Sequence, residues 1–112
     1  MRLENYIAKL QGMIAADGDQ KWYIGLGEPH AWRGDYSQLA FEPVRDTTTQ
    51  KMLDEAISCL GMEFTGYKGG EYIMRAETPC WIDNYGCWSR VPLTSKALRL
   101  LKVLEATHTN QD

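Results

Sequence analysis

Two glycine-containing segments each place an aromatic ring beside a cationic side chain, a combination suited to binding a phosphate-bearing base. The first segment runs from His30 to Tyr36 and the second from Phe64 to Gly70. A guanidinium or ammonium group neutralises phosphate, while an aromatic ring stacks on a base. Glycine lets the backbone come close to a ligand. The predicted ligand-binding residues are Trp32, Arg33, Gly34, Tyr36, Tyr67, Lys68, Gly69 and Gly70.

The first segment also has a structural interpretation. Trp32 would then fill the core from a loop, and Arg33 would form an ion pair with Glu28 or Asp35. An aromatic residue in a long loop often packs rather than binds. The sequence therefore leaves both roles of Trp32 open.

The second segment is compatible with a plain hairpin, because Gly69 and Gly70 suit a tight turn without any ligand. Lys68 beside them is typical of a phosphate-cradling loop, but the full P-loop spacing is missing. Residues 25–27 (Gly-Leu-Gly) follow a strand, yet Glu28 then places a carboxylate where a dinucleotide phosphate would sit. We therefore predict neither a P-loop nor a Rossmann site.

A third aromatic cluster comprises Trp81, Tyr85 and Trp88. Indole rings serve as stacking platforms and interface anchors, but a small core also uses them to gain buried area. The carboxylates have no spacing that selects an acid/base pair. The sequence thus names no catalytic residue, and it favours a binding protein over an enzyme.

The cysteines Cys59, Cys80 and Cys87 make an odd count, which suits a reducing compartment better than a disulfide framework. They lack the paired spacing of a zinc site, although a Cys3His site with His30 stays open as an alternative. We predict free thiols, no metal and no cofactor.

The charge and hydropathy of the chain exclude some classes of partner. A net charge of −3 and a pI near 5.3 argue against general nucleic-acid binding, which needs a basic face. No apolar run is long enough to span a membrane, and polar residues interrupt the N-terminus too early for a secretion signal. We expect a cytosolic protein without membrane contact.

Helical spacing of Leu3, Ile7, Leu10 and Ile14 predicts an amphipathic helix over the first fifteen residues or so. A short strand follows at residues 22–24, then a loop over residues 25–36 with three glycines and a proline. Alternation around Leu39 and Phe41 predicts a second strand that ends before Pro43.

A capping box at residues 47–50, with Asp46 as a competing cap, predicts a helix over residues 47–60. Its buried face would hold Leu53, Ala56, Ile57 and Leu60, and Gly61 would end it in a left-handed conformation. Strands at residues 62–64 and 72–74 would form a hairpin, and another short strand would follow Pro79.

The C-terminal part fits a helix capped by Ser95, with Leu98, Leu101 and Leu104 inward and Lys96, Arg99 and Lys102 outward. A strand over residues 96–105 is the alternative. Together these elements predict one α+β domain over residues 1–106, with a frayed polar tail at residues 107–112. Its mainly antiparallel sheet would have about four to five short strands, with about two to three helices packed on it.

The segments from Trp32 to Pro43 and from Phe64 to Met74, continued by residues 78–81 and 84–86, resemble a family of small, uncharacterised accessory proteins of tailed phages and prophages. The resemblance covers residues 20–88 and implies a protein of the bacterial host's cytoplasm. Such a protein would sequester a nucleotide-type signal of host defence without catalysis. Alternatively, it would inhibit a host defence protein through a protein–protein interface. A homo-oligomer is compatible with both hypotheses.

Overall fold

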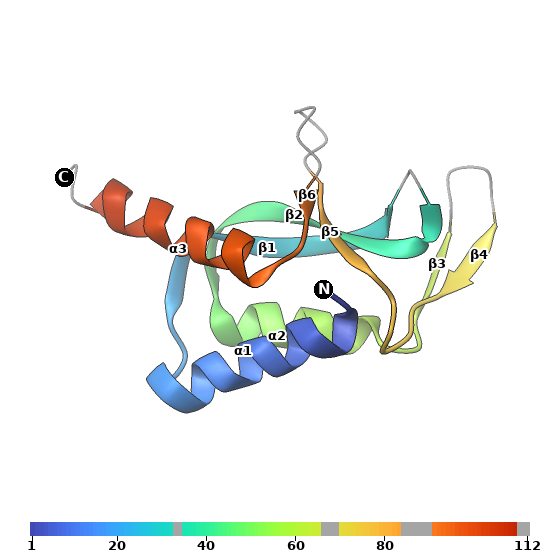
Figure 1. The fold of residues 1–112 in the computed structure, drawn as a ribbon, viewed down its shortest axis with the longest axis horizontal. Helices are drawn as coiled ribbons and strands as arrows, with labels where there is room; N and C mark the ends of the chain where they lie inside the picture. The colour runs from blue at the N-terminus through green and yellow to red at the C-terminus, as the bar shows by residue number, and fades with distance from the viewer. Residues whose placement is uncertain (33–34, 66–69, 84–90, 110–112) are drawn as a thin grey trace.

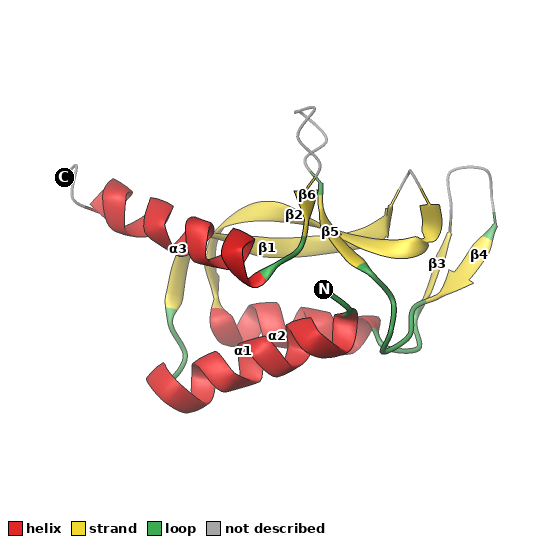
Figure 2. Cartoon of the chain, in the orientation of Figure 1, coloured by secondary structure: helices red, strands yellow, loops and turns green. Residues whose placement is uncertain are grey.

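The computed structural model describes residues 1–32, 35–65, 70–83 and 91–109, and for residues 35–36 and 103–109 it describes the backbone only. The helices in these ranges are α1 (Leu3–Asp17), α2 (Thr49–Cys59) and α3 (Ser95–Thr109) (Figure 1). The strands are β1 (Lys21–Trp32), β2 (Asp35–Thr48), β3 (Glu63–Thr65), β4 (Glu71–Ile73), β5 (Cys80–Ile82) and β6 (Val91–Pro92) (Figure 2). The predicted α+β class is confirmed.

Four of these strands form one sheet in the order β1-β2-β5-β6, and β3 and β4 form a separate two-stranded sheet. The pairs β1–β2 and β5–β6 are antiparallel, whereas β2 and β5 run parallel. Helices α1 and α2 lie side by side across one face of the larger sheet, and α3 packs against β1 (Figure 1). The core therefore lies between this helical layer and the sheet, as expected for an α+β domain.

Helix α1 has the predicted position and inward face. Leu3, Tyr6, Ile7 and Leu10 are buried, and the Tyr6 ring meets the Phe41 ring of β2 edge-on with centroids 5.2 Å apart. Gly18 follows the helix with a positive φ of 76°, and its N–H donates to the Ile14 carbonyl. The left-handed conformation at Gly18 ends the helix where glycine has no steric penalty.

The predicted loop over residues 25–36 is wrong. Strands β1 and β2 form one long hairpin whose pairing runs from Lys21 with Thr48 to Trp32 with Asp35. Pro43 lies inside β2 and pairs with Leu26 rather than ending the strand. Two of the strands are accordingly much longer than the short strands that the sequence predicts.

The glycines in β1 have a packing role that their composition does not reveal. A Cβ atom at Gly25 would lie 2.4 Å from Thr47 Cγ2 and 2.9 Å from Met52 Sδ, so the backbone approaches its neighbours too closely for a side chain. The register shifts between Gly27 and His30, and Glu28 in this bulge has a φ of 46°. A bulge absorbs one extra residue without ending the strand.

Helix α2 begins two residues later than predicted, and its N-cap lies one residue later. Thr48 is the N-cap and its side chain accepts the Lys51 N–H at 3.1 Å, while Thr47, the predicted cap, is buried in β2. Asp46, the competing cap, also lies in β2 and has a φ of 55°. Because β2 keeps the backbone extended through Thr48, the helix cannot start earlier.

The buried face of α2 is only partly the predicted one. Leu53 and Ala56 are buried, but Ile57 and Leu60 are 44% and 43% exposed. The other buried residues of the helix are Thr49, Met52 and Cys59. Spacings of three and four residues from Thr49 through Met52, Ala56 and Cys59 make this inward stripe, which is rotated away from Ile57.

The remaining elements follow the predicted order. Gly61 has the expected positive φ of 76°, and β3 and β4 pair as an antiparallel hairpin. The predicted turn at residues 68–71 lies only in part within the described residues, which resume at Gly70, and the predicted turn at residues 84–86 lies outside them. Strand β5 forms after Pro79, where the sequence places it.

Helix α3 confirms the predicted C-terminal helix rather than the alternative strand, and it includes the first three residues of the predicted tail. Thr94, rather than Ser95, accepts the Ala97 N–H with its side chain and so caps the helix. Leu98 is fully buried, as predicted. Lys102 does not point outward, because its ammonium lies 4.4 Å from the centroid of the Trp22 ring.

Candidate functional site

Trp32 and Trp81 form a stacked pair at one end of the larger sheet. Their ring centroids are 4.3 Å apart and their planes differ by 8°. Trp32 is the last residue of β1, whereas Trp81 is the middle residue of β5 and is separated from β1 by β2. The fold thus joins an aromatic residue of the first glycine-containing segment to one of the third aromatic cluster.

The strand register shows how Trp81 comes to project from the face of β5 opposite the core. Ala40 of β2 pairs with His30 on one side and Trp81 on the other, and residues opposite one another on neighbouring strands project to the same face. Cys80 and Ile82, which flank Trp81, are buried, while Trp81 is only half-buried.

The polar edges of the two indoles differ in their partners. Trp81 Nε1 donates a hydrogen bond to Gln38 Oε1. Trp32 Nε1 is buried and has no acceptor among the described residues. His30 Nδ1 lies 3.1 Å from the Ala31 carbonyl oxygen.

The stacked pair lies beside the segments that carry the sequence-predicted site. Trp32 directly precedes residues 33–34, and β5 leads into residues 84–90. Strand β1 contacts β3 and β2 contacts β4, so the small β3–β4 sheet stands at the same end of the hairpin (Figure 1). The described parts that border the two glycine-containing segments therefore belong to one end of the molecule.

Of the eight predicted ligand-binding residues, Trp32 and Gly70 have described side-chain surroundings. Trp32 is half-buried in the stack, and Gly70 is exposed before β4. Tyr36 lies in β2 rather than in a loop. Arg33, Gly34, Tyr67, Lys68 and Gly69 lie outside the described residues, so their placement stays a prediction.

Sequence reasoning did not assign Trp81 or Gln38 to the site. The signal for Trp81 was its position between two apolar residues of a short strand, which turns it away from the core face. Gln38 carries no comparable signal, because its role comes from the parallel pairing of β2 with β5. Parallel pairing joins residues distant in sequence and cannot be inferred from local alternation.

The electrostatics of the described residues do not resemble those of a nucleophilic or metal centre. Burial, reinforced by the Glu55 carboxylate, raises the pKa of Cys59 to about 11. Burial raises the pKa of Cys80 to about 12, although the N-terminal ammonium opposes the shift. Both thiols are free and stay protonated at neutral pH, unlike a reactive cysteine. Within the described ranges no group of three or more His, Cys, Asp or Glu side chains could hold a metal ion.

Comparisons with protein-family models, curated proteins and solved structures found no match to this chain. In the described part of the chain, no helix is both long and apolar enough to cross a membrane. Conclusions about function therefore depend on the residues themselves.

Proposed function

We propose that this protein binds a small, phosphate-bearing, base-containing molecule at the Trp32–Trp81 end of its sheet and does not convert it. The stacked pair carries the proposal. A nucleobase would extend the stack on an accessible ring face, and each stacked base contributes about 1–3 kcal/mol.

Arg33 and Lys68 would neutralise the phosphate in this proposal. They come from the two segments whose flanking strands meet at this end of the molecule. The net charge of −3 disfavours a long polyanion, so the ligand would be a single small molecule rather than a nucleic acid. From the resemblance to phage proteins, we infer a nucleotide-type signal of host defence, which the protein would sequester in the bacterial cytoplasm.

The test is calorimetry of the full chain with mononucleotides, dinucleotides and cyclic dinucleotides. Arg33→Ala should weaken binding of the responding nucleotide by at least about tenfold, since a guanidinium–phosphate pair is worth about 1.5–3 kcal/mol. Arg45→Ala is the matched control, because exposed Arg45 also lies beside an aromatic ring, that of Tyr23, but away from the stacked pair. Mass spectrometry of the recovered nucleotide should show that it is intact.

Two results would contradict nucleotide binding at this site. One is the absence of saturable binding by any member of the panel. The other is an Arg33→Ala variant that binds as tightly as the original chain or that loses its melting transition, because the residue would then be structural. A recovered ligand that has been hydrolysed would replace sequestration by catalysis.

A protein–protein interface is the second candidate function, and a separate group of residues favours it. Ile57, Leu60, Met62 and Ile73 are each between 43% and 51% exposed and gather where α2 ends and β3–β4 begins. Exposed apolar residues in one region are typical of interaction surfaces. If this surface inhibits a host protein, Ile57→Asp should abolish the inhibition while Arg33→Ala leaves it unchanged. If Arg33→Ala instead abolishes the inhibition and Ile57→Asp leaves it unchanged, the result supports nucleotide binding.

A further inference from the structure

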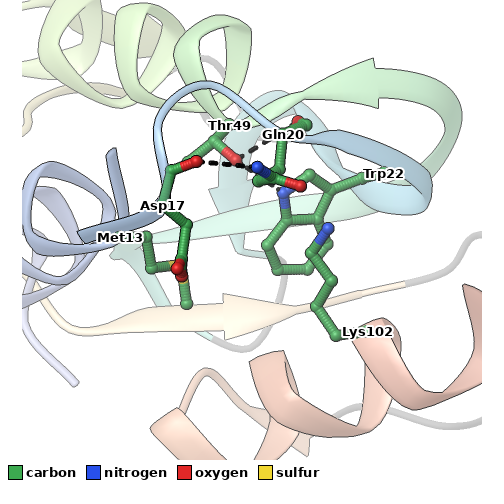
Figure 3. A pocket seen from close by; sticks show the side chains of 6 residues that line it. All are labelled: Met13, Asp17, Gln20, Trp22, Thr49 and Lys102. Carbon is green, nitrogen blue, oxygen red and sulfur yellow. Dashed lines mark hydrogen bonds between the residues drawn. The ribbon is translucent and has the colours of Figure 1, made fainter. Parts of the chain in front are cut away.

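A hollow lies at the other end of β1, between α1, α2 and α3. It has a volume of about 390 Å³ and is lined by Met13, Asp17, Gln20, Trp22, Thr49 and Lys102 (Figure 3). These residues come from the end of α1, the following turn, the starts of β1 and α2, and the middle of α3. A hollow of this size lies within the range of small-molecule pockets.

The floor of this hollow is held in place by hydrogen bonds. Trp22 Nε1 donates to Thr49 Oγ1 at 2.8 Å, and the Thr49 backbone N–H donates to the Gln20 carbonyl at 2.9 Å. The Thr49 hydroxyl also donates to that carbonyl, at 3.3 Å. Trp22 and Thr49 are both buried. The floor is therefore rigid and largely apolar, with its donors already paired to neighbouring groups.

Opposite charges stand on the two walls. Lys102 reaches over the Trp22 ring and donates to the Lys21 carbonyl at 3.0 Å, which fixes the ammonium on the α3 side. Asp17 lies on the α1 side and is exposed, and the Gln20 side chain donates to its backbone carbonyl at 2.7 Å (Figure 3). The Met13 side chain adds apolar surface on the Asp17 side.

We propose that this hollow binds a small zwitterion with an apolar body, such as an amino acid or a dipeptide. The ligand ammonium would face Asp17, its carboxylate would face Lys102, which covers the buried Trp22 ring, and its apolar body would lie against Met13. A ligand that is only anionic would meet the Asp17 carboxylate, and one that is only cationic would meet the Lys102 ammonium. A zwitterion is the class that complements both walls, and this site is independent of the proposed nucleotide site.

The experiment measures binding of leucine, leucyl-leucine and trileucine by calorimetry and by the indole N–H resonance of Trp22. The series keeps the chemistry constant and varies the distance between the two ligand charges, so one length should bind best. N-acetylated and C-amidated forms of that ligand lack its ammonium and its carboxylate charge, respectively. Each should bind at least about tenfold more weakly, as expected for the loss of one charged hydrogen bond.

Two pairs of variants assign the ends of the ligand. Asp17→Asn should weaken binding of the zwitterion but leave binding of its N-acetylated form unchanged. Lys102→Met should likewise weaken binding of the zwitterion but leave binding of its C-amidated form unchanged. Asp19→Asn and Lys96→Met are the matched controls, since each removes the same charge from an exposed residue of the same turn or helix that does not line the hollow. Neither control should alter binding.

The proposal requires one ligand of the series that both gives saturable heat and shifts the Trp22 resonance. It is overturned if none of them does both. It is also overturned if Asp19→Asn weakens binding as much as Asp17→Asn, because net charge alone would then explain the effect. Removing the Lys102 ammonium removes contacts between α3 and β1, so the melting temperature of the Lys102→Met variant is measured as well. Asp17 is exposed, and its variant decides the outcome even if the Lys102 variant does not fold.

Discussion

The glycines of this chain fall into two physical classes that the sequence does not distinguish. Gly25 lies where β1 touches β2 and α2, and a Cβ atom there would overlap Thr47 and Met52. Gly12 lies in the middle of α1, where a Cβ atom would meet nothing within 4 Å. Close packing makes the first glycine necessary, whereas the second only adds backbone entropy to the unfolded chain.

Alanine at these two positions should therefore change stability in opposite directions. Gly25→Ala should lower the free energy of unfolding by about 1–3 kcal/mol, because the overlap with buried Thr47 must be relieved by backbone movement. Gly12→Ala should raise it by about 0.5–1 kcal/mol. Urea denaturation of both variants measures the difference. Equal effects of the same sign would refute the close approach at Gly25.

Helices were more predictable from the sequence than the long strands. All three helices form where local periodicity predicts them, because a helix makes its hydrogen bonds within one segment, although the caps of α2 and α3 each lie one residue from the predicted one. The β1–β2 hairpin escaped prediction, since its glycines at positions 25 and 27 and its proline at position 43 have the composition of a loop. Only the pairing of Leu26 with Pro43, which is not local, shows that they belong to strands.

The candidate site was predictable only in part, for a related reason. Sequence reasoning singled out Trp32 and Trp81 as unusual aromatics in different segments, but the stacking of one on the other depends on the order β1-β2-β5. The hollow beneath Lys102 was not predicted. Helical periodicity places that lysine outward, and only the packing of α3 against β1 brings it over Trp22.

The rotation of α2 provides a direct test at the level of one helix. Leu53 is 7% exposed and Ile57 is 44% exposed, although the amphipathic pattern predicts both to be buried. Leu53→Ala should lower the free energy of unfolding by about 2–5 kcal/mol, and Ile57→Ala by less than about 1 kcal/mol. Chemical denaturation of the two variants compares them. If both variants lose a similarly large free energy of unfolding, Ile57 is buried as the sequence predicts and α2 is not rotated.

The molecule has one core in which ionisable groups from three elements converge. Tyr6 of α1, Cys59 of α2 and Cys80 of β5 are buried close enough to influence one another. Burial is the main cause in each case, and it raises the pKa of the Tyr6 hydroxyl as well as those of the two thiols. Because a charged form is costly in this core, the protonated forms of these groups favour the folded state.

Stability should consequently fall in alkaline solution. In the unfolded chain the thiols have their ordinary pKa of 9.0. In the folded chain burial raises the pKa of Cys59 to about 11 and the pKa of Cys80 to about 12. Between these values the unfolded state binds fewer protons than the native state, so each thiol lowers the free energy of unfolding by about 1.4 kcal/mol per pH unit. The stabilisation is fully present below pH 9 and is lost as the pH rises toward the pKa values of the folded chain.

Urea denaturation at increasing pH should show this decline. Cys80→Ala should make the free energy of unfolding fall less steeply with pH, because one of the two thiols no longer contributes. A free energy of unfolding that stays constant across this alkaline range would mean that water reaches the thiols and that the core is not closed around them.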